Sequence, residues 1–288
     1  MINALAEGLI DGAVLAGFDP DIPYEAKAFV ATSREEILAC AGSKYQPHPQ
    51  LLGIREAVER GLTRIAITAT PCHVLSLRKM MLQDEFAEFT SRIKIIISNI
   101  CGAHWSRHGT ESLIRDWMKV DLADVKAIKY RARPFPGEFR VTLRDGKTAS
   151  NSFVTGKSGL SQLAKFTPEE CRYCLEKVAS AADLVVGDTW HHPVLSPEKL
   201  DHYSEDDCSR DERIQAARNG MTALVVRSET GQKFVDAAIA SGMIKMYPET
   251  EAGWREFLCT IHDVGKPNYN GPVIQTRIIR NQPVREYY

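Results

Sequence analysis

Four of the seven cysteines are spaced as metal ligands often are. Cys171 and Cys174 form a C-x-x-C motif, which offers two thiolates on one turn of the chain. Cys72 and Cys101 each follow a short apolar segment. Four thiolates suit a tetrahedral zinc ion or a 4Fe-4S cluster, so the set predicts a metal or cluster site. Buried structural cysteines and a dithiol redox pair are the alternatives that the spacing leaves open.

Cys72 and Arg78 also have the spacing of the C-x5-R loop of tyrosine phosphatases and arsenate reductases. In such a loop a thiolate attacks phosphorus while backbone amides and the arginine bind the phosphate oxygens. Pro71 and the apolar residues after Cys72 instead indicate a helix, and the segment lacks the glycine that lets amides converge. If this segment is a helix, the guanidinium group of Arg78 is expected to contact either a cofactor phosphate or solvent.

Alternating strand and helix patterns position the first two cysteines. Thr63–Thr70 and Ile93–Asn99 have strand character, whereas Pro71–Gln83 and Gly109–Val120 have helical character. This order predicts parallel strands joined by right-handed crossovers, with the functional edge at their carboxyl ends. If the two strands are neighbours, the thiols that follow them lie at the same edge within ligand distance.

The pattern changes after residue 122. Three segments have strand character, Val125–Ala132, Glu138–Arg144 and Lys147–Phe153, and Asp145-Gly146 between the last two is a hairpin turn signal. They predict an antiparallel β insert. Further segments complete the expected order: a strand at Leu9–Ala16, a connection from Phe29–Ala31, helices at Arg34–Cys40, Leu51–Gly61 and Leu175–Ala181, a strand at Ala182–Gly187, and a surface loop at His191–Asp211.

These elements predict an α/β fold with a parallel or mixed sheet core, flanking helices and the antiparallel insert. The expected domains are an N-terminal α/β part at 1–122, the insert at 123–157 and a C-terminal α/β part at 158–288. The first part carries two of the four cysteines, and the last carries the C-x-x-C motif.

Composition excludes several classes of function. The chain of 288 residues has 36 Lys and Arg against 37 Asp and Glu, a formal net charge of -1, and no basic block. It therefore offers no electrostatic reason to bind nucleic acid or an anionic membrane. The apolar runs are far shorter than the roughly 20 residues that cross a bilayer, so no membrane span is expected. The first residues lack the basic and apolar regions of a signal peptide, which predicts a cytoplasmic protein.

The sequence resembles the coenzyme F420 hydrogenase/dehydrogenase beta-subunit family. The resemblance spans roughly residues 9 to 245 and rests on motifs that occur in the family's order: Gly42-Ser43-Lys44-Tyr45 with Pro47, Thr70-Pro71-Cys72-His73 with Leu77-Arg78-Lys79, Cys101, and Cys171-x-x-Cys174 leading to Ala182–Trp190. Each motif alone is weakly specific, whereas their common order makes coincidence improbable.

The resemblance implies an electron-transfer flavoprotein with FAD next to one 4Fe-4S cluster. A flavin takes up two electrons as a hydride and releases them singly, and a cluster carries one electron at a time. By the family pattern, the cluster ligands are Cys72, Cys101, Cys171 and Cys174. The function implied is to pass electrons between FAD, with coenzyme F420 or a similar hydride carrier, and another subunit of a redox complex.

For the flavin, the resemblance implies that Ser43, Lys44 and Tyr45 form a cofactor-facing loop, since a cation suits a pyrophosphate and an aromatic ring suits the flavin plane. Arg78 and Asp188 are further expected cofactor contacts. An ordinary turn with a solvated lysine, and a plain strand end at Asp188, are the alternatives.

The sequence departs from the family pattern at its start. Relatives have a Gly-Gly-x-x-Thr segment just before the part that matches Ile2–Gly12, and this sequence has none. One flavin-contacting segment is then expected to be missing or to come from another chain, so the resemblance supports the cluster more strongly than FAD. The alternative from a different class is a non-catalytic assembly or binding module in which the four thiolates hold a structural zinc ion.

Overall fold

The computed structural model describes residues 1–132, 137–152, 163–189, 192, 195–200, 202–247, 249–263 and 275–282, without the side chains of 197, 198, 208 and 258–263. Trp190, the last residue of the motif that begins at Ala182, lies outside these residues. Contacts divide the chain into two units. Unit 1 comprises 1–101, 178–187 and 223–246, and unit 2 comprises 102–177, 188–222 and 247–288.

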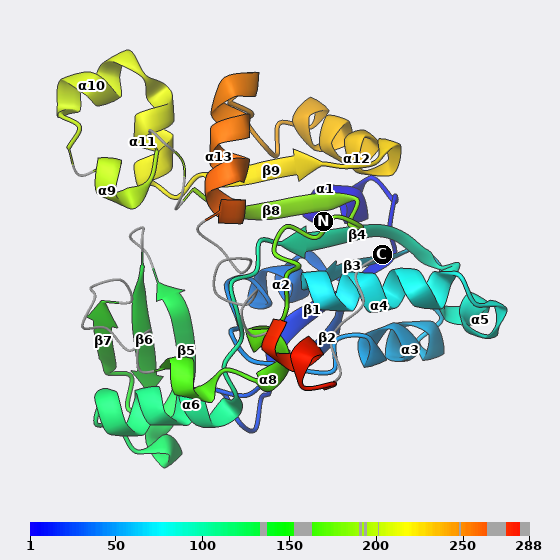
Figure 1. The fold of residues 1–288 in the computed structure, drawn as a ribbon, viewed down its shortest axis with the longest axis horizontal. Coiled ribbons are helices and arrows are strands. Elements are labelled where there is room, and N and C mark those ends of the chain that lie inside the picture. Colours follow the sequence, from blue (N-terminus) through cyan, green and yellow to red (C-terminus); the bar gives the residue numbers. More distant parts are fainter. Residues whose placement is uncertain are drawn as a thin grey trace. The chain divides into compact units, whose positions relative to one another are not determined.

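A mixed six-stranded sheet in the order β2-β1-β3-β4-β8-β9 organises unit 1 (Figure 1). β3 lies parallel to both β1 and β4, and β4 lies parallel to β8, whereas β2 is antiparallel to β1. The strands are β1 (Gly12–Phe18), β2 (Ala26–Ala31), β3 (Ile65–Ala69), β4 (Ile93–Asn99), β8 (Leu184–Asp188) and β9 (Thr222–Val226). The helices are α1 (Ile2–Ala6), α2 (Arg34–Ala39), α3 (Leu52–Glu59), α4 (Pro71–Met81), α5 (Ala87–Thr90) and α12 (Glu229–Ala240).

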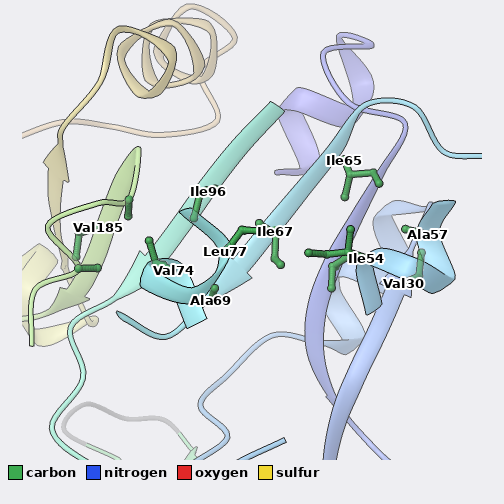
Figure 2. Packing of buried hydrophobic residues seen from close by; sticks show 13 residues of the cluster. Val30, Ile54, Ala57, Ile65, Ile67, Ala69, Val74, Leu77, Ile96 and Val185 are labelled. Atoms are coloured by element: carbon green, nitrogen blue, oxygen red, sulfur yellow. The ribbon is translucent and has the colours of Figure 1, made fainter. Parts of the chain in front are cut away.

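Helices cover both faces of this sheet because alternate strand residues point to opposite sides. Ile65 and Ile67 of β3 pack in one apolar cluster with Ile54 of α3 and Leu77 of α4 (Figure 2). Ala66, between them, belongs to a second cluster. The second cluster draws on α1 through Ala4 and on α12 through Val235. Burying each large aliphatic side chain stabilises the fold by roughly 1.5–3 kcal/mol.

A separate antiparallel sheet of three strands, β5 (Val125–Ala132), β6 (Glu138–Leu143) and β7 (Thr148–Ser152), belongs to unit 2. Its buried face holds the rings of Tyr130 and Phe139, whose centroids are 5.5 Å apart. Unit 2 also contains the helical segments α6 (Arg107–Ser112), a π-helical turn (Leu113–Trp117), α8 (Glu169–Arg172), α9 (Pro197–Leu200), α10 (Glu205–Arg210), α11 (Glu212–Arg218) and α13 (Glu251–Asp263).

The structure confirms the predicted fold class: an α/β core with a mixed sheet, flanking helices and an antiparallel β insert. One strand was missed, since Phe29–Ala31 is the end of β2 rather than the start of a connection. β2 gains its strand conformation by pairing with β1 along its whole length, which local periodicity does not reveal. None of the described helices is long and apolar enough to cross a membrane.

Two local predictions were wrong. Leu175–Ala181 is not a helix, because Ala179 has a φ of 46° and is buried in the core of unit 1, where the backbone follows tertiary contacts. His191–Asp211 is not one loop, since its described part contains α9 and α10. A capping box between Ser204 and Asp207 starts α10.

Candidate functional site

The carboxyl ends of β3 and β4 bring the first two candidate ligands to one edge of the sheet. These strands are parallel neighbours, with Ala69 opposite Ser98 near their ends. Cys72 is the second residue of α4, directly after β3, and Cys101 follows β4 by two residues. Cys101 is 8% exposed, and Cys72 is half-buried. The predicted position of both cysteines at the carboxyl edge is confirmed.

A polar side chain, that of Thr70, contacts the sulfur of Cys72. The Oγ1 atom of Thr70 lies 3.2 Å from Cys72 Sγ and 3.1 Å from His73 Nδ1. The ring of His73 meets the ring of His48 edge-on, with 6.2 Å between the centroids. His48 belongs to the loop of residues 40–51, so this loop and the Cys72 segment lie against each other at the same edge.

Two buried glutamines fasten this loop to the sheet. Gln46 accepts a hydrogen bond from the Ala26 amide and donates to the Tyr24 carbonyl. Gln50, 1% exposed, donates to the carbonyls of Val14 and Thr68 in β1 and β3. Their amide groups act in place of backbone partners, which keeps the loop in position without regular structure. The loop predicted to face a cofactor is therefore held at the edge that carries Cys72.

Within this loop Ser43 is exposed and Tyr45 is half-buried. The ammonium group of Lys44 donates to the carbonyls of Cys40, Ala41 and Gly42 at 2.5, 3.3 and 3.1 Å, and lies 5.4 Å from the centre of the Phe18 ring. Burial lowers the pKa of Lys44 to about 8, because it penalises the charged ammonium. The lysine predicted to meet a pyrophosphate thus has carbonyl partners in this structure.

Arg78 points away from the carboxyl edge. Its Nε donates to the carbonyl of Ala181 at 2.9 Å, and its Nη2 lies 3.1 Å from the Asp183 carboxylate. Both partners precede β8, at the amino end of that strand. Arg78 is therefore not brought together with Cys72, and its expected cofactor contact stays a prediction.

Asp188, the last residue of β8, stands at the carboxyl end of the strand beside β4. Its carboxylate is 41% exposed and faces Nη1 of Arg131 at 3.4 Å. Because the Asp188 side chain is partly exposed, its carboxylate is accessible to a ligand despite this pairing. Its expected cofactor contact likewise stays a prediction.

The C-x-x-C motif lies at the end of the short helix α8 in unit 2. Cys171 is in the last turn of α8, and Cys174, 5% exposed, follows it with its Sγ 3.5 Å from the Glu176 carbonyl oxygen. Between them, the ring of Tyr173 packs under the Arg277 guanidinium at 4.4 Å, and Arg277 also pairs with Glu169. Tyr173 and Glu169 are thus tied to a helical segment near the end of the chain.

The four cysteines are divided evenly between the two units. Cys72 and Cys101 belong to unit 1, whereas Cys171 and Cys174 belong to unit 2. Among the described residues, no three His, Cys, Asp or Glu side chains form a group that could hold a metal ion. One thiol of each pair, Cys101 and Cys174, is buried, and thiolates are the usual ligands of iron-sulfur clusters.

Sequence reasoning gave no role to three residues that shape this edge. Thr70 occupies a helix start, where a threonine usually caps, so only the structure reveals its contact with sulfur. Gln50 lies directly before the expected helix Leu51–Gly61, and no motif assigned it a role. The sequence did contain a signal for Asp183. An acidic residue directly before an apolar strand is expected to be buried and therefore to need a hydrogen-bond or charge partner.

Comparison with known proteins identifies the family. A profile described as the C terminus of the "Coenzyme F420 hydrogenase/dehydrogenase, beta subunit" matches residues 62–252, and the corresponding profile of the N-terminal part matches residues 1–54. The coenzyme F420 hydrogenase subunit beta of Methanosarcina barkeri is 26% identical over 253 residues, which is 87% of this chain and 74% of that protein.

Two further proteins extend the comparison. The F(420)H(2) dehydrogenase of Methanosarcina mazei has a subunit that is 24% identical over 231 residues, 80% of this chain and 54% of that protein. Among solved structures, a chain of the F420-reducing NiFe hydrogenase complex from Methanosarcina barkeri aligns with a TM-score of 0.71 and 25% identity, covering 99% of this chain and 86% of that chain. The chain belongs to the coenzyme F420 hydrogenase/dehydrogenase beta-subunit family.

Proposed function

We propose that this chain is an electron-transfer subunit of an oxidoreductase complex. It would pass electrons between FAD, with coenzyme F420 or a similar hydride carrier as the small-molecule partner, and another subunit through a 4Fe-4S cluster. Family membership supports the oxidoreductase class, and the relatives named above are subunits of F420-linked hydrogenases and dehydrogenases. The observation that carries the proposal is the contact between the predicted cofactor loop and the Cys72 segment.

The proposed cluster ligands are Cys72, Cys101, Cys171 and Cys174. Thiolates are the usual ligands of iron-sulfur clusters. Support comes from the common edge at which the first two cysteines follow their strands, and from the spacing of the second two. The burial of Cys101 and Cys174 would limit access of water and oxidants to the bound sulfurs.

The proposed flavin contacts are Ser43, Lys44 and Tyr45, with Asp188 and Arg78 as further candidates. When bound, FAD would supply hydride chemistry and the cluster single-electron transfer. The loop's residues would orient the cofactor at the edge that bears Cys72, because buried glutamines hold the loop there. Lys44 would bind a phosphate by exchanging its carbonyl partners for phosphate oxygens.

Anaerobic purification with paired iron, sulfide and flavin assays tests the proposal. About four irons and one FAD per chain are expected. Cys171→Ser and Cys174→Ser should each abolish the broad visible absorbance of a 4Fe-4S cluster. Cys40→Ser is the matched control, because Cys40 lies outside the proposed ligand set and should leave the iron content unchanged.

The other outcomes separate the alternatives. A colourless protein with about one zinc per chain would contradict the redox proposal and support a structural zinc module. Four irons without flavin would retain the cluster and contradict FAD binding by this chain alone. Full iron retention in Cys171→Ser would contradict the ligand assignment.

A further inference from the structure

Thr70 stands at the start of helix α4 but does not cap it. A threonine at this position usually accepts a hydrogen bond from a backbone amide of the first turn. Thr70 makes no such side-chain cap bond. The hydroxyl group is therefore available for another partner.

That partner is the sulfur of Cys72. Thr70 Oγ1 lies 3.2 Å from Cys72 Sγ, well within hydrogen-bonding range for sulfur, and 3.1 Å from His73 Nδ1. A hydroxyl group has one hydrogen to donate and two lone pairs to accept with. A thiolate can only accept. When Cys72 is a thiolate, Thr70 must donate to the sulfur, and Nδ1 of His73 can donate to Thr70 Oγ1.

We infer that Thr70 is a positioning residue for the proposed cluster: its hydroxyl group donates a hydrogen bond to the Cys72 sulfur and raises the cluster's reduction potential. This inference rests on the proposed cluster ligation by Cys72. A hydrogen bond to a ligand sulfur withdraws electron density and stabilises the more negative, reduced form. His73 Nδ1 lies within hydrogen-bonding distance of the same hydroxyl oxygen.

The test compares Thr70→Val with Thr70→Ser. Valine keeps the shape of threonine but removes the hydroxyl group, whereas serine keeps the hydroxyl group. Because Thr70 makes no cap bond, neither change removes a helix-capping interaction. After anaerobic reconstitution of the full chain, iron and sulfide contents are measured, and the midpoint potential is determined by spectroelectrochemical titration.

Thr70→Val should bind as much iron as the wild type but have a lower midpoint potential. Thr70→Ser should have the same midpoint potential as the wild type. A purely structural role would change iron content or folding without a selective shift in potential. Equal potentials for all three proteins, or an equal shift in Thr70→Ser, would overturn the inference.

A second measurement tests the Thr70–Cys72 hydrogen bond in protein that contains no cluster. In the cluster-free full chain, alkylation of Cys72 by iodoacetamide at neutral pH is followed by peptide mass spectrometry, with Cys40 as the internal reference. Loss of the hydroxyl donor should change the rate of Cys72 alkylation in Thr70→Val, whereas Thr70→Ser should react at the wild-type rate. Equal rates would refute the Thr70–Cys72 hydrogen bond. A wild type without iron but with this rate difference would refute the proposed function and retain the bond.

Discussion

Lys44 holds its ammonium group at a largely buried site, and burial disfavours the charged form. Burial lowers its pKa from 10.5 to about 8, although three carbonyl groups accept its hydrogens. Between these two pH values the unfolded chain binds more protons than the folded chain at this residue. The free energy of unfolding therefore rises with pH across that window, and the charged ammonium costs stability below pH 8.

The variant Lys44→Met should remove this dependence. Relative to the variant, the wild type should gain about 2 kcal/mol in free energy of unfolding between about pH 7.5 and 9.5. Urea unfolding of both proteins at several pH values measures the difference. Parallel stability curves over this range would contradict a lowered pKa at Lys44.

At the scale of elements, Gly187 controls how closely β8 approaches the segment that leads to Cys101. A Cβ atom at Gly187 would lie 2.5 Å from Cδ1 and 3.0 Å from Cβ of Ile100. The Ile100 amide donates to the Val186 carbonyl at 2.9 Å, which holds the two backbones together. Ile100 cannot retreat without moving Cys101, the residue that follows it.

We therefore expect Gly187→Ala to destabilise the protein by about 1–3 kcal/mol through overpacking. If Cys101 is a cluster ligand, this variant should also lose iron faster to a chelator. Gly102→Ala is the matched control, because nothing among the described residues lies within 4 Å of the added atom. Similar unfolding free energies for the two variants would show that β8 adjusts to the extra methyl group.

At the scale of the whole molecule, Asp183 joins the three stretches of chain that make up unit 1. Its Oδ1 accepts hydrogen bonds from Arg78 and from the Ser228 hydroxyl group, at 3.1 and 2.8 Å, and its Oδ2 accepts from the Ile96 amide at 2.8 Å. These donors come from 1–101 and 223–246, while Asp183 belongs to 178–187. One carboxylate thus links the three separate chain segments of unit 1 by hydrogen bonds.

Asp183→Asn removes the charge and one acceptor atom, so at least one of these donors loses its partner. We expect a loss of about 2–3 kcal/mol in free energy of unfolding, measured in urea. Glu59→Gln provides the comparison, because it breaks the exposed Arg55–Glu59 pair and should leave stability nearly unchanged. An equally small effect of both substitutions would contradict the joining role of Asp183.

The sequence alone determined the fold class and the cysteine set. Apolar periodicity predicted β4 with its observed bounds, and the start of α4 at Pro71, because these elements follow local patterns. The turn signal at Asp145-Gly146 predicted the antiparallel strands β6 and β7. The order of strands and helices then implied that Cys72 and Cys101 follow neighbouring strands, which the sheet confirms.

Only the tertiary structure decided which groups the side chains meet. The Thr70 hydroxyl contacts sulfur rather than capping α4, and Arg78 binds Asp183 rather than facing the carboxyl edge. Ala179 leaves the helical conformation because the core of unit 1 fixes its backbone. Periodicity reports which residues are buried along one element. Periodicity does not indicate where a side chain points, nor which distant residue it contacts. Arg78, for example, binds Asp183, which is 105 residues away, because packing between distant segments determines both the direction and the partner of a side chain.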